Sequence, residues 1–267
     1  MKLPAPRSAP RHVTPKPRAF TIVAGAVLAL IGMALIATWF LPGPLATVRA
    51  TGLIGSEQAD AAARRVMVAF ENVQAVWQRQ FGNHDAPKVR LHSGVATSPC
   101  LDGQAMSGPF YCPATKEAVF DLAFFEALNA RLRRDGDLGT ALVVALISAS
   151  HVQDELGLLA AAEEARRSSE TGEHPAIEAA LAAQAACLAG VWAALAAGSV
   201  GAVPPGFYDQ LIGIARNVMD DRSADIPAHL DPFAAAVRAT READFNRGYA
   251  AGKPAACLPQ GSLPGTG

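Results

Sequence analysis

His151 and Glu155 are the pair of side chains in this sequence best spaced to act together on a metal ion. They lie four residues apart, so a helix would place them on one face, one turn from each other. An imidazole and a carboxylate are ligands that Zn²⁺ accepts, and bound zinc can activate water for hydrolysis. The residue after His151 is Val152. The glutamate that acts as general base in an H-E-x-x-H zinc motif therefore has no counterpart there.

Other acids and histidines near this pair are available to complete a ligand set. They are Asp154, Glu163, Glu164, His174 and Glu178. The charged, serine-containing composition of residues 163–174 is more typical of a solvated connection than of a metal site. A metal site built on His151 and Glu155 is therefore kept as an alternative.

All four cysteines follow the first 50 residues: Cys100, Cys112, Cys187 and Cys257. An even number of cysteines in an oxidising compartment is typical of disulfides. Zinc bound by four thiolates is the competing interpretation, but the sequence contains no C-x-x-C pair. The residues favour two disulfides and leave their pairing open.

The composition excludes several classes of protein. Of the 267 residues, 51% are hydrophobic and 18% are charged, and the formal net charge is -1. These values exclude a disordered chain and a chain that coats nucleic acid. The sequence also lacks a nucleophilic-serine elbow, a phosphate-binding loop and a dinucleotide-binding fingerprint. We expect no nucleic-acid partner.

The first 55 residues are predicted to anchor the chain in a membrane. From Phe20 to Leu41 no residue is charged, and as a helix this segment is roughly 33 Å long, enough to span a bilayer. Residues 1–19 hold five of the 23 basic residues and no acidic residue. The positive-inside rule therefore predicts a cytoplasmic, proline-rich tail over 1–19 and an extracytoplasmic body after the linker at 42–55. A cleaved signal peptide is the alternative.

Residues 56–258 are predicted to form an α+β domain, mainly helical with a small sheet, before a flexible tail at 259–267. Apolar residues spaced by three and four predict a helix from Ser56 to about Phe81. Alternation predicts a half-buried strand over 88–96, with His92 on its polar face. Residues 118–122 predict a second strand, followed by a helix.

The C-terminal half is predicted to be helical. Residues 141–147 are apolar on all sides, which predicts a buried central helix with Asp137 as its cap. Pro175 can start another helix that runs to about Ala197. Two further helices are expected near 206–219 and 232–251.

The segment SGPFYCP, residues 107–113, resembles a motif of the neutral zinc metallopeptidase family of membrane-anchored bacterial proteins. The segments HVQ at 151–153, CLAGVWA at 187–193 and FNRGY at 245–249 resemble further motifs of that family. The resemblance covers nearly all of residues 57–258 and implies a zincin-like domain behind one membrane span. It also implies disulfides that pair Cys100 with Cys112 and Cys187 with Cys257.

Members of this family carry an H-E-x-x-H-H-V-Q run with two zinc-binding histidines and a general-base glutamate. A third zinc ligand and an aspartate that orients a histidine lie in an E-x-x-A-D-C run. Alignment on the shared H-V-Q places the first histidine at Leu146, the general base at Ile147 and the second histidine at Ser150. Alignment on the shared cysteine places the third ligand at Ala182 and the aspartate at Ala186. All five positions have lost the side chain that this chemistry needs.

The sequence therefore predicts a single-pass protein of the cell membrane, held there by residues 20–41, with a catalytically inactive extracytoplasmic domain. This pseudo-peptidase would carry no zinc cofactor and would bind a polypeptide partner of the envelope or act as a scaffold. The resemblance implies a hydrogen-bonded packing role for His151. An active metallopeptidase with relocated zinc ligands around His151, and a purely structural envelope protein, stay open as alternatives.

Overall fold

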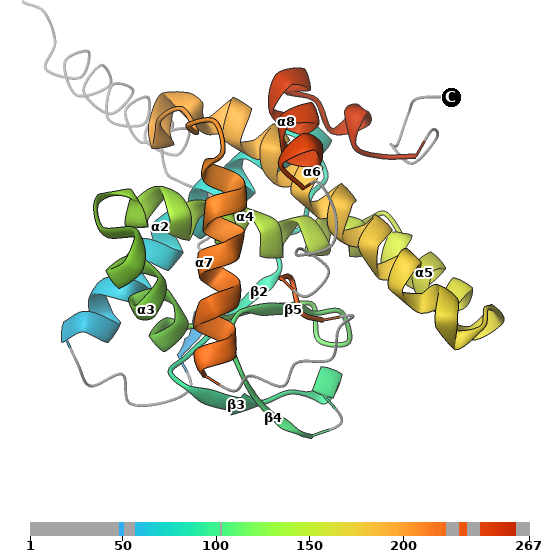
Figure 1. Cartoon of the computed structure of the whole chain (residues 1–267), viewed down its shortest axis with the longest axis horizontal. Helices are drawn as coiled ribbons and strands as arrows, with labels where there is room; N and C mark the ends of the chain where they lie inside the picture. Colours follow the sequence, from blue (N-terminus) through green and yellow to red (C-terminus); the bar gives the residue numbers. More distant parts are fainter. Residues whose placement is uncertain (1–47, 51–56, 102, 223–229, 234–240, 260–267) are drawn as a thin grey trace, which may run out of the picture. The chain divides into compact units, whose positions relative to one another are not determined.

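A computed structural model describes residues 48–50, 57–101, 103–222, 230–233 and 241–259 (Figure 1). Internal contacts divide the chain into two compact units, Met1–Leu45 and Ala46–Gly267, and every described residue belongs to the second unit. The predicted cytoplasmic tail, the membrane span and Ser56 lie outside the described residues, and so does the predicted C-terminal tail after its first residue.

The described strands form one sheet of four strands and one of two. The larger sheet has the order β1 (Val48–Ala50), β2 (Lys88–His92), β6 (Glu117–Asp121) and β5 (Phe110–Cys112). Its first three strands are parallel, and β5 is antiparallel to β6. The smaller sheet pairs β3 (Val95–Thr97) with β4 (Ala105–Ser107) in antiparallel fashion. Within the described chain, β5 is therefore an edge strand.

Seven α-helices make the described domain mainly helical, in agreement with the predicted α+β class. They are α2 (Glu57–Phe81), α3 (Leu122–Leu132), α4 (Gly136–Glu155), α5 (Leu158–Ser168), α6 (His174–Val200), α7 (Phe207–Asp221) and α8 (Arg241–Ala251).

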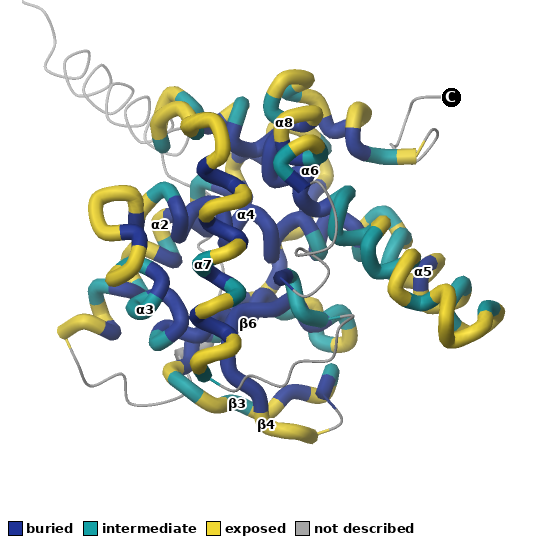
Figure 2. The backbone as a smooth tube through the Cα atoms, in the orientation of Figure 1, coloured by how far each residue is buried: buried dark blue, intermediate teal, exposed yellow. Residues whose placement is uncertain are grey.

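Helix α4 lies at the centre of the domain, as its all-round apolar composition predicts. It contacts α2, α3, α5 and α6 as well as β5 and β6, and every residue from Gly139 to Ala149 is buried (Figure 2). The prediction that Asp137 caps this helix is wrong, because the helix already begins at Gly136. Asp137 instead lies in the first turn and forms an exposed ion pair with Arg65 at 3.0 Å.

One described helical segment, Thr171–Val200, is long and apolar enough to cross a membrane by length and composition alone. Its C-terminal half is buried from Ala185 to Ala193, and α6 contacts α2, α4, α5 and α8. Packing within the domain therefore accounts for its apolar composition.

The predicted solvated connection over 163–174 is wrong in its first half, because α5 continues to Ser168. Charged residues stabilise this exposed helix through ion pairs three and four residues apart. Glu163 pairs with Arg166 and Arg167, and Glu164 also pairs with Arg167. The charges that suggested a loop therefore support a helix.

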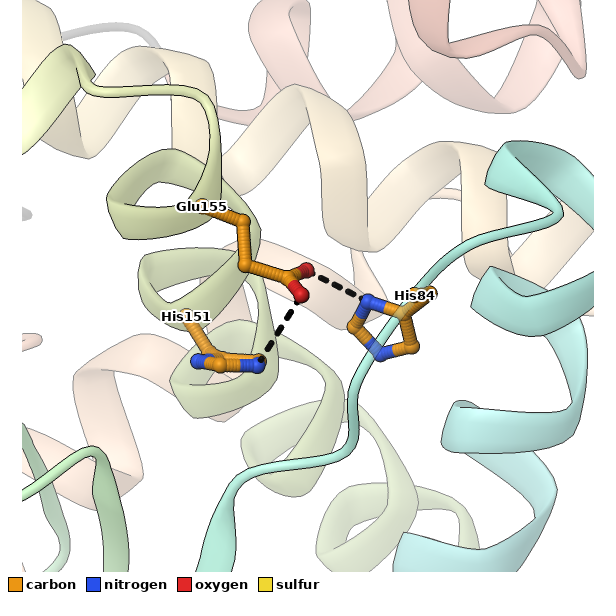
Figure 3. A group of neighbouring side chains, drawn as sticks. All are labelled: His84, His151 and Glu155. Atoms are coloured by element: carbon orange, nitrogen blue, oxygen red, sulfur yellow. Dashed lines mark hydrogen bonds and ion pairs between the residues drawn. The ribbon is translucent and has the colours of Figure 1, made fainter.

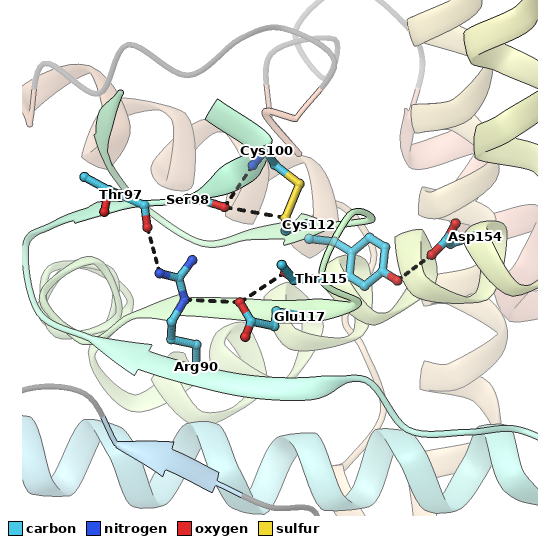
Figure 4. The surroundings of a disulfide bond; sticks show 9 residues. Arg90, Thr97, Ser98, Cys100, Cys112, Thr115, Glu117 and Asp154 are labelled. Carbon is cyan, nitrogen blue, oxygen red and sulfur yellow. Dashed lines mark hydrogen bonds and ion pairs between the residues drawn. A yellow bond between two sulfur atoms is a disulfide. The ribbon is translucent and has the colours of Figure 1, made fainter. Parts of the chain in front are cut away.

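The predicted single strand over 88–96 is divided between the two sheets. Gly94 has a positive φ of 82° and makes the turn between β2 and β3. His92 lies on the polar face of β2, as predicted, but this face is not exposed, and only 6% of the residue is accessible. Arg90, on the same face, donates to the carbonyl of Thr97 in β3 and pairs with Glu117 (Figure 4). The polar face of β2 is thus covered by its neighbours.

Asp121 joins four parts of the domain from a fully buried position. Its Oδ1 accepts from the backbone N–H groups of Gly94 at 2.8 Å and Ala123 at 3.1 Å, and the second contact caps α3. Its Oδ2 accepts from the N–H of Gly108 at 2.9 Å and from Arg222, just after α7, at 2.8 Å. Every lone-pair direction of this carboxylate is therefore occupied.

Two disulfides are present, with the pairing that the family resemblance implies. Cys100 is bonded to Cys112 across 12 residues, next to β5 (Figure 4). Cys187 in α6 is bonded to Cys257, which follows α8, across 70 residues. The second disulfide fastens the C-terminal part of the described chain to a core helix.

Gly190 and Gly248 allow α6 and α8 to pack with their backbones in contact. A methyl group at Gly248 would overlap the carbonyl of Cys187, and one at Gly190 would overlap the carbonyl of Phe245. We expect Gly248→Ala to lower the free energy of unfolding by about 1–3 kcal/mol, measured by urea denaturation. Gly213→Ala in α7 is the control, because the added methyl group would have no atom within 4 Å apart from the adjacent backbone of its own helix. Equal stability of the two variants would contradict this packing argument.

Candidate functional site

A cavity of about 80 Å³ lies between β5, the C-terminal half of α4 and the N-terminal half of α6. Its lining consists of Tyr111, Pro113, Leu146, Ile147, Ser150, Gln153, Leu159, Glu178, Leu181, Ala182, Ala185 and residues 230–232. Four of the five positions singled out in the sequence therefore meet at one place, and the fifth, Ala186, is buried directly after Ala185 in α6.

The side chains around this cavity are mainly apolar or already engaged in hydrogen bonds. Leu146 and Ile147 are 2% and 1% accessible. The amide of Gln153 donates to the carbonyl of Leu181 at 2.8 Å and to Gln184 at 2.7 Å. The cavity is thus suited to hold an apolar group.

Next to the cavity, the structure brings His84, His151 and Glu155 together (Figure 3). One ligand atom from each lies within 4.8 Å of the others. His84 Nδ1 donates to Glu155 Oε2 at 2.5 Å, and His151 Nε2 lies 3.7 Å from Glu155 Oε1. His151 and Glu155 come from the last turns of α4, whereas His84 comes from the connection between α2 and β2.

Hydrogen bonds orient both imidazole rings from the outside. His84 Nε2 lies 2.7 Å from Gln74 Oε1, and the amide of Gln74 donates to Ser148. His151 Nδ1 lies 2.9 Å from the hydroxyl of Tyr111, which donates to Asp154 at 2.7 Å. Because Tyr111 also lines the cavity, it connects the cavity to the histidine cluster.

Burial and charge act in opposite directions on the groups of the cluster. Burial lowers the pKa of His151 below 6.5, against the hydrogen bond to Asp85 and the charge of Glu155. Burial would raise the pKa of Glu155, but hydrogen bonding to His84 and the charges of both histidines lower it overall. Burial, together with the hydrogen bond to Asp154, raises the pKa of Tyr111.

Two buried histidines make stability depend on pH. Burial lowers the pKa of His92 as well as that of His151, so the unfolded chain binds these protons first as the pH falls below 6.5. We therefore expect the free energy of unfolding to decrease from pH 7 to pH 5, by at most about 1.4 kcal/mol per pH unit for each histidine. Urea unfolding at several pH values measures this slope. His92→Phe should reduce it, and an unchanged slope in that variant would contradict the assignment.

The sequence predicts part of this cluster and misses the rest. His151 and Glu155 meet as their spacing predicts, but His84 was not recognised, because it lies in a loop 67 residues before His151. The run His84-Asp85-Ala86-Pro87 identifies a short connection, but no sequence pattern links this histidine to His151. The other predicted ligands lie elsewhere: Asp154 binds Tyr111, Glu163 and Glu164 pair with arginines of α5, His174 contacts the carbonyl of Arg166, and Glu178 lines the cavity.

Comparison with known proteins identifies the family. The model of the family described as "Putative neutral zinc metallopeptidase" matches residues 23–259. The chain belongs to this family. Its relatives include "Uncharacterized protein YpfJ" of Escherichia coli (strain K12), 28% identical over 212 residues, 76% of this chain and 72% of the relative. "Uncharacterized protein Rv2575" of Mycobacterium tuberculosis (strain ATCC 25618 / H37Rv) is 35% identical over 131 residues, 48% of this chain and 43% of the relative. No solved structure matches the chain.

The zinc that the neutral zinc metallopeptidase family implies does not fit the residues at the cavity. Leucine, isoleucine and alanine have no lone pair to give to a metal ion. Of the aligned ligand positions, Ser150 alone has an oxygen, and a serine hydroxyl is not among the usual zinc ligands. Glu178 and Asp231 also line the cavity, but Asp231 is paired with Arg216 at 2.8 Å. Imidazole nitrogens are found only in the neighbouring cluster, among the described residues that surround the cavity.

Proposed function

We propose that this member of the family is a pseudo-peptidase, which binds a segment of polypeptide in the cavity between β5, α4 and α6 and does not cleave it. The observation that carries this proposal is the convergence of Leu146, Ile147, Ser150 and Ala182 on one cavity. The family implies zinc and a general base at this place. In this zincin-like domain the same place has an apolar lining, which could hold a side chain of the bound polypeptide.

The cavity would hold one side chain of a polypeptide ligand. Tyr111 belongs to β5 and lines the cavity, and Pro113 follows directly. Phe110, Tyr111 and Cys112 are 0%, 4% and 0% accessible, so β5 is covered although it lies at the edge of the sheet. In this proposal the ligand is therefore held by the pocket that receives its side chain.

The proposed setting is outside the cytoplasm. In this proposal, residues 20–41 hold the chain in the cell membrane, residues 1–19 stay in the cytoplasm, and the domain over 56–258 faces the opposite side. Two disulfides support this topology, because such bonds persist in oxidising compartments. The ligand would then be a polypeptide of the cell envelope.

The test uses the full-length protein in detergent micelles with fluorescently labelled, unfolded casein as the probe. We expect no cleavage on gels, with or without added Zn²⁺, and an increase in anisotropy on binding. Ala182→Phe fills the cavity and should weaken binding about tenfold. Ala180→Phe is the matched control, because Ala180 is exposed on the same helix.

Two outcomes would contradict this proposal in different ways. Zinc-dependent cleavage that is lost in His151→Ala would favour the alternative of an active metallopeptidase, for which the cluster of His84, His151 and Glu155 is the supporting observation. Absence of both binding and cleavage would favour a purely structural envelope protein.

A further inference from the structure

The three side chains His84, His151 and Glu155 have the composition of a zinc ligand set, two imidazoles and one carboxylate. His84 and His151 are 6% and 2% accessible, while the side chain of Glu155 is 23% accessible. The cluster is therefore shielded from solvent on the histidine side and reachable through the carboxylate.

The two rings are arranged as they would be around one ion. Their centroids lie 5.5 Å apart, with an interplanar angle of 61°. Two imidazoles bound to a single tetrahedral zinc ion would place their centroids roughly 5 Å apart, given zinc–nitrogen distances of about 2.0–2.1 Å. The inner nitrogens, Nδ1 of His84 and Nε2 of His151, both lie on the side of Glu155 (Figure 3).

The outer nitrogens already have the partners that ligand histidines usually have. A metal-bound histidine donates its other N–H to an oxygen, which fixes the ring. His84 Nε2 faces the carbonyl oxygen of the Gln74 amide, and His151 Nδ1 faces the oxygen of Tyr111, whose own proton goes to Asp154. The hydrogen bonds that would orient both rings are therefore in place.

Each histidine ring of the cluster faces more oxygen atoms than a neutral imidazole can donate to. His151 Nε2 lies 2.6 Å from the carbonyl of Asp85, and His84 Nδ1 faces Glu155. Each ring thus has oxygen on both sides, although a neutral imidazole carries only one N–H. Rotation of the Gln74 amide would relieve this for His84, because its NH₂ group could then donate to Nε2. Rotation of the Gln74 amide would not supply the N–H group that His151 lacks.

We propose that His84, His151 and Glu155 form a binding site for one divalent transition-metal ion of the Zn²⁺ class. Such an ion fastens the connection between α2 and β2 to the end of α4. With the ion on the inner nitrogens, both neutral rings donate outward to Gln74 and Tyr111. The site is separate from the aligned family positions at the cavity, and it does not depend on whether the chain cleaves or binds peptides.

Binding requires two small movements. The carbonyl of Asp85 lies 2.6 Å from His151 Nε2, the nitrogen that would bind the ion, so this carbonyl must move away from the ring. Two ligands of a tetrahedral zinc ion lie about 3.3 Å apart, whereas His84 Nδ1 and Glu155 Oε2 are 2.5 Å apart in their hydrogen bond. His84 lies outside the helices and strands, between Phe81 and Lys88. Its ring can therefore move away from Glu155 without displacing a helix.

The experiment measures binding of Co²⁺ and Zn²⁺ to the full-length chain in detergent, freed of any affinity tag and stripped with chelator. We expect one equivalent of Co²⁺ per chain, with visible absorption typical of tetrahedral coordination, and its displacement by Zn²⁺. Glu155→Gln and His84→Asn should weaken binding by more than about 100-fold, and Tyr111→Phe, which removes a positioning group, by about 10–100-fold. His174→Asn is the control, since this histidine lies outside the cluster, and its affinity should not change.

A chain that binds neither ion, or that binds them equally well after Glu155→Gln and His84→Asn, would overturn the proposal. If those variants fail to fold, zinc X-ray absorption on the unaltered chain decides: two imidazoles support the site, and their absence refutes it. Casein cleavage by the zinc-loaded chain would count against the proposed pseudo-peptidase and leave the metal site intact. Loss of the metal site would leave the peptide-binding test unaffected.

Discussion

Asp121→Ala should lower the free energy of unfolding by about 3–5 kcal/mol, among the largest effects of any single substitution in this protein. The substitution removes a fully buried carboxylate that accepts hydrogen bonds from three backbone N–H groups and from Arg222. Those donors would lose their partner inside the protein, and breaking a buried ion pair on one side costs about this much. Urea or thermal denaturation measures the loss.

The matched control for this prediction is Asp221→Ala. Asp221 also pairs with an arginine, Arg131, but its side chain is 66% exposed. Exposed ion pairs contribute about 0–1 kcal/mol, so this variant should remain close to the original stability. Similar losses of unfolding free energy in the two variants would show that burial of Asp121 does not increase its contribution to stability.

Much of the fold follows from the spacing of apolar residues. The regular stripes of α2 and the all-apolar interior of α4 predicted both helices and the central position of α4. Prediction failed where long-range contacts decide the outcome. The chain turns at Gly94 because Asp121, 27 residues later, holds that N–H, and His92 is buried because β2 is covered on its polar face.

The candidate site is predictable to a similar degree. Helix geometry places His151 and Glu155 together. The family pattern singled out Leu146, Ile147, Ser150 and Ala182, and all four line one cavity. His84 escaped prediction because a loop residue has no periodicity that points toward a partner. The hydrogen bonds of Gln74 and Tyr111 to the two rings depend on tertiary packing, which local sequence patterns do not contain.

Removal of the disulfide between Cys187 and Cys257 should destabilise the protein by about 4 kcal/mol. In the chain-entropy model, the stabilisation grows with the number of residues that the bond encloses. The two cysteines of this disulfide are 70 positions apart in the sequence, and the bond joins α6 to the segment after α8. The double variant Cys187→Ala/Cys257→Ala, compared with the unaltered chain by urea denaturation under non-reducing conditions, measures the effect.

The other disulfide serves as the internal comparison. Cys100 and Cys112 are 12 positions apart, so removal of their disulfide should cost about 3 kcal/mol in the same model. A larger loss for the shorter loop would mean that local packing near β5, and not chain entropy, determines the stabilisation. If both losses occur as expected, reduction of the native protein should remove much of its stability, because domains of this kind have only about 5–15 kcal/mol in total. A domain so dependent on oxidised cysteines would fold poorly in a reducing cytoplasm, which is the physical reason for proposing that it functions outside that compartment.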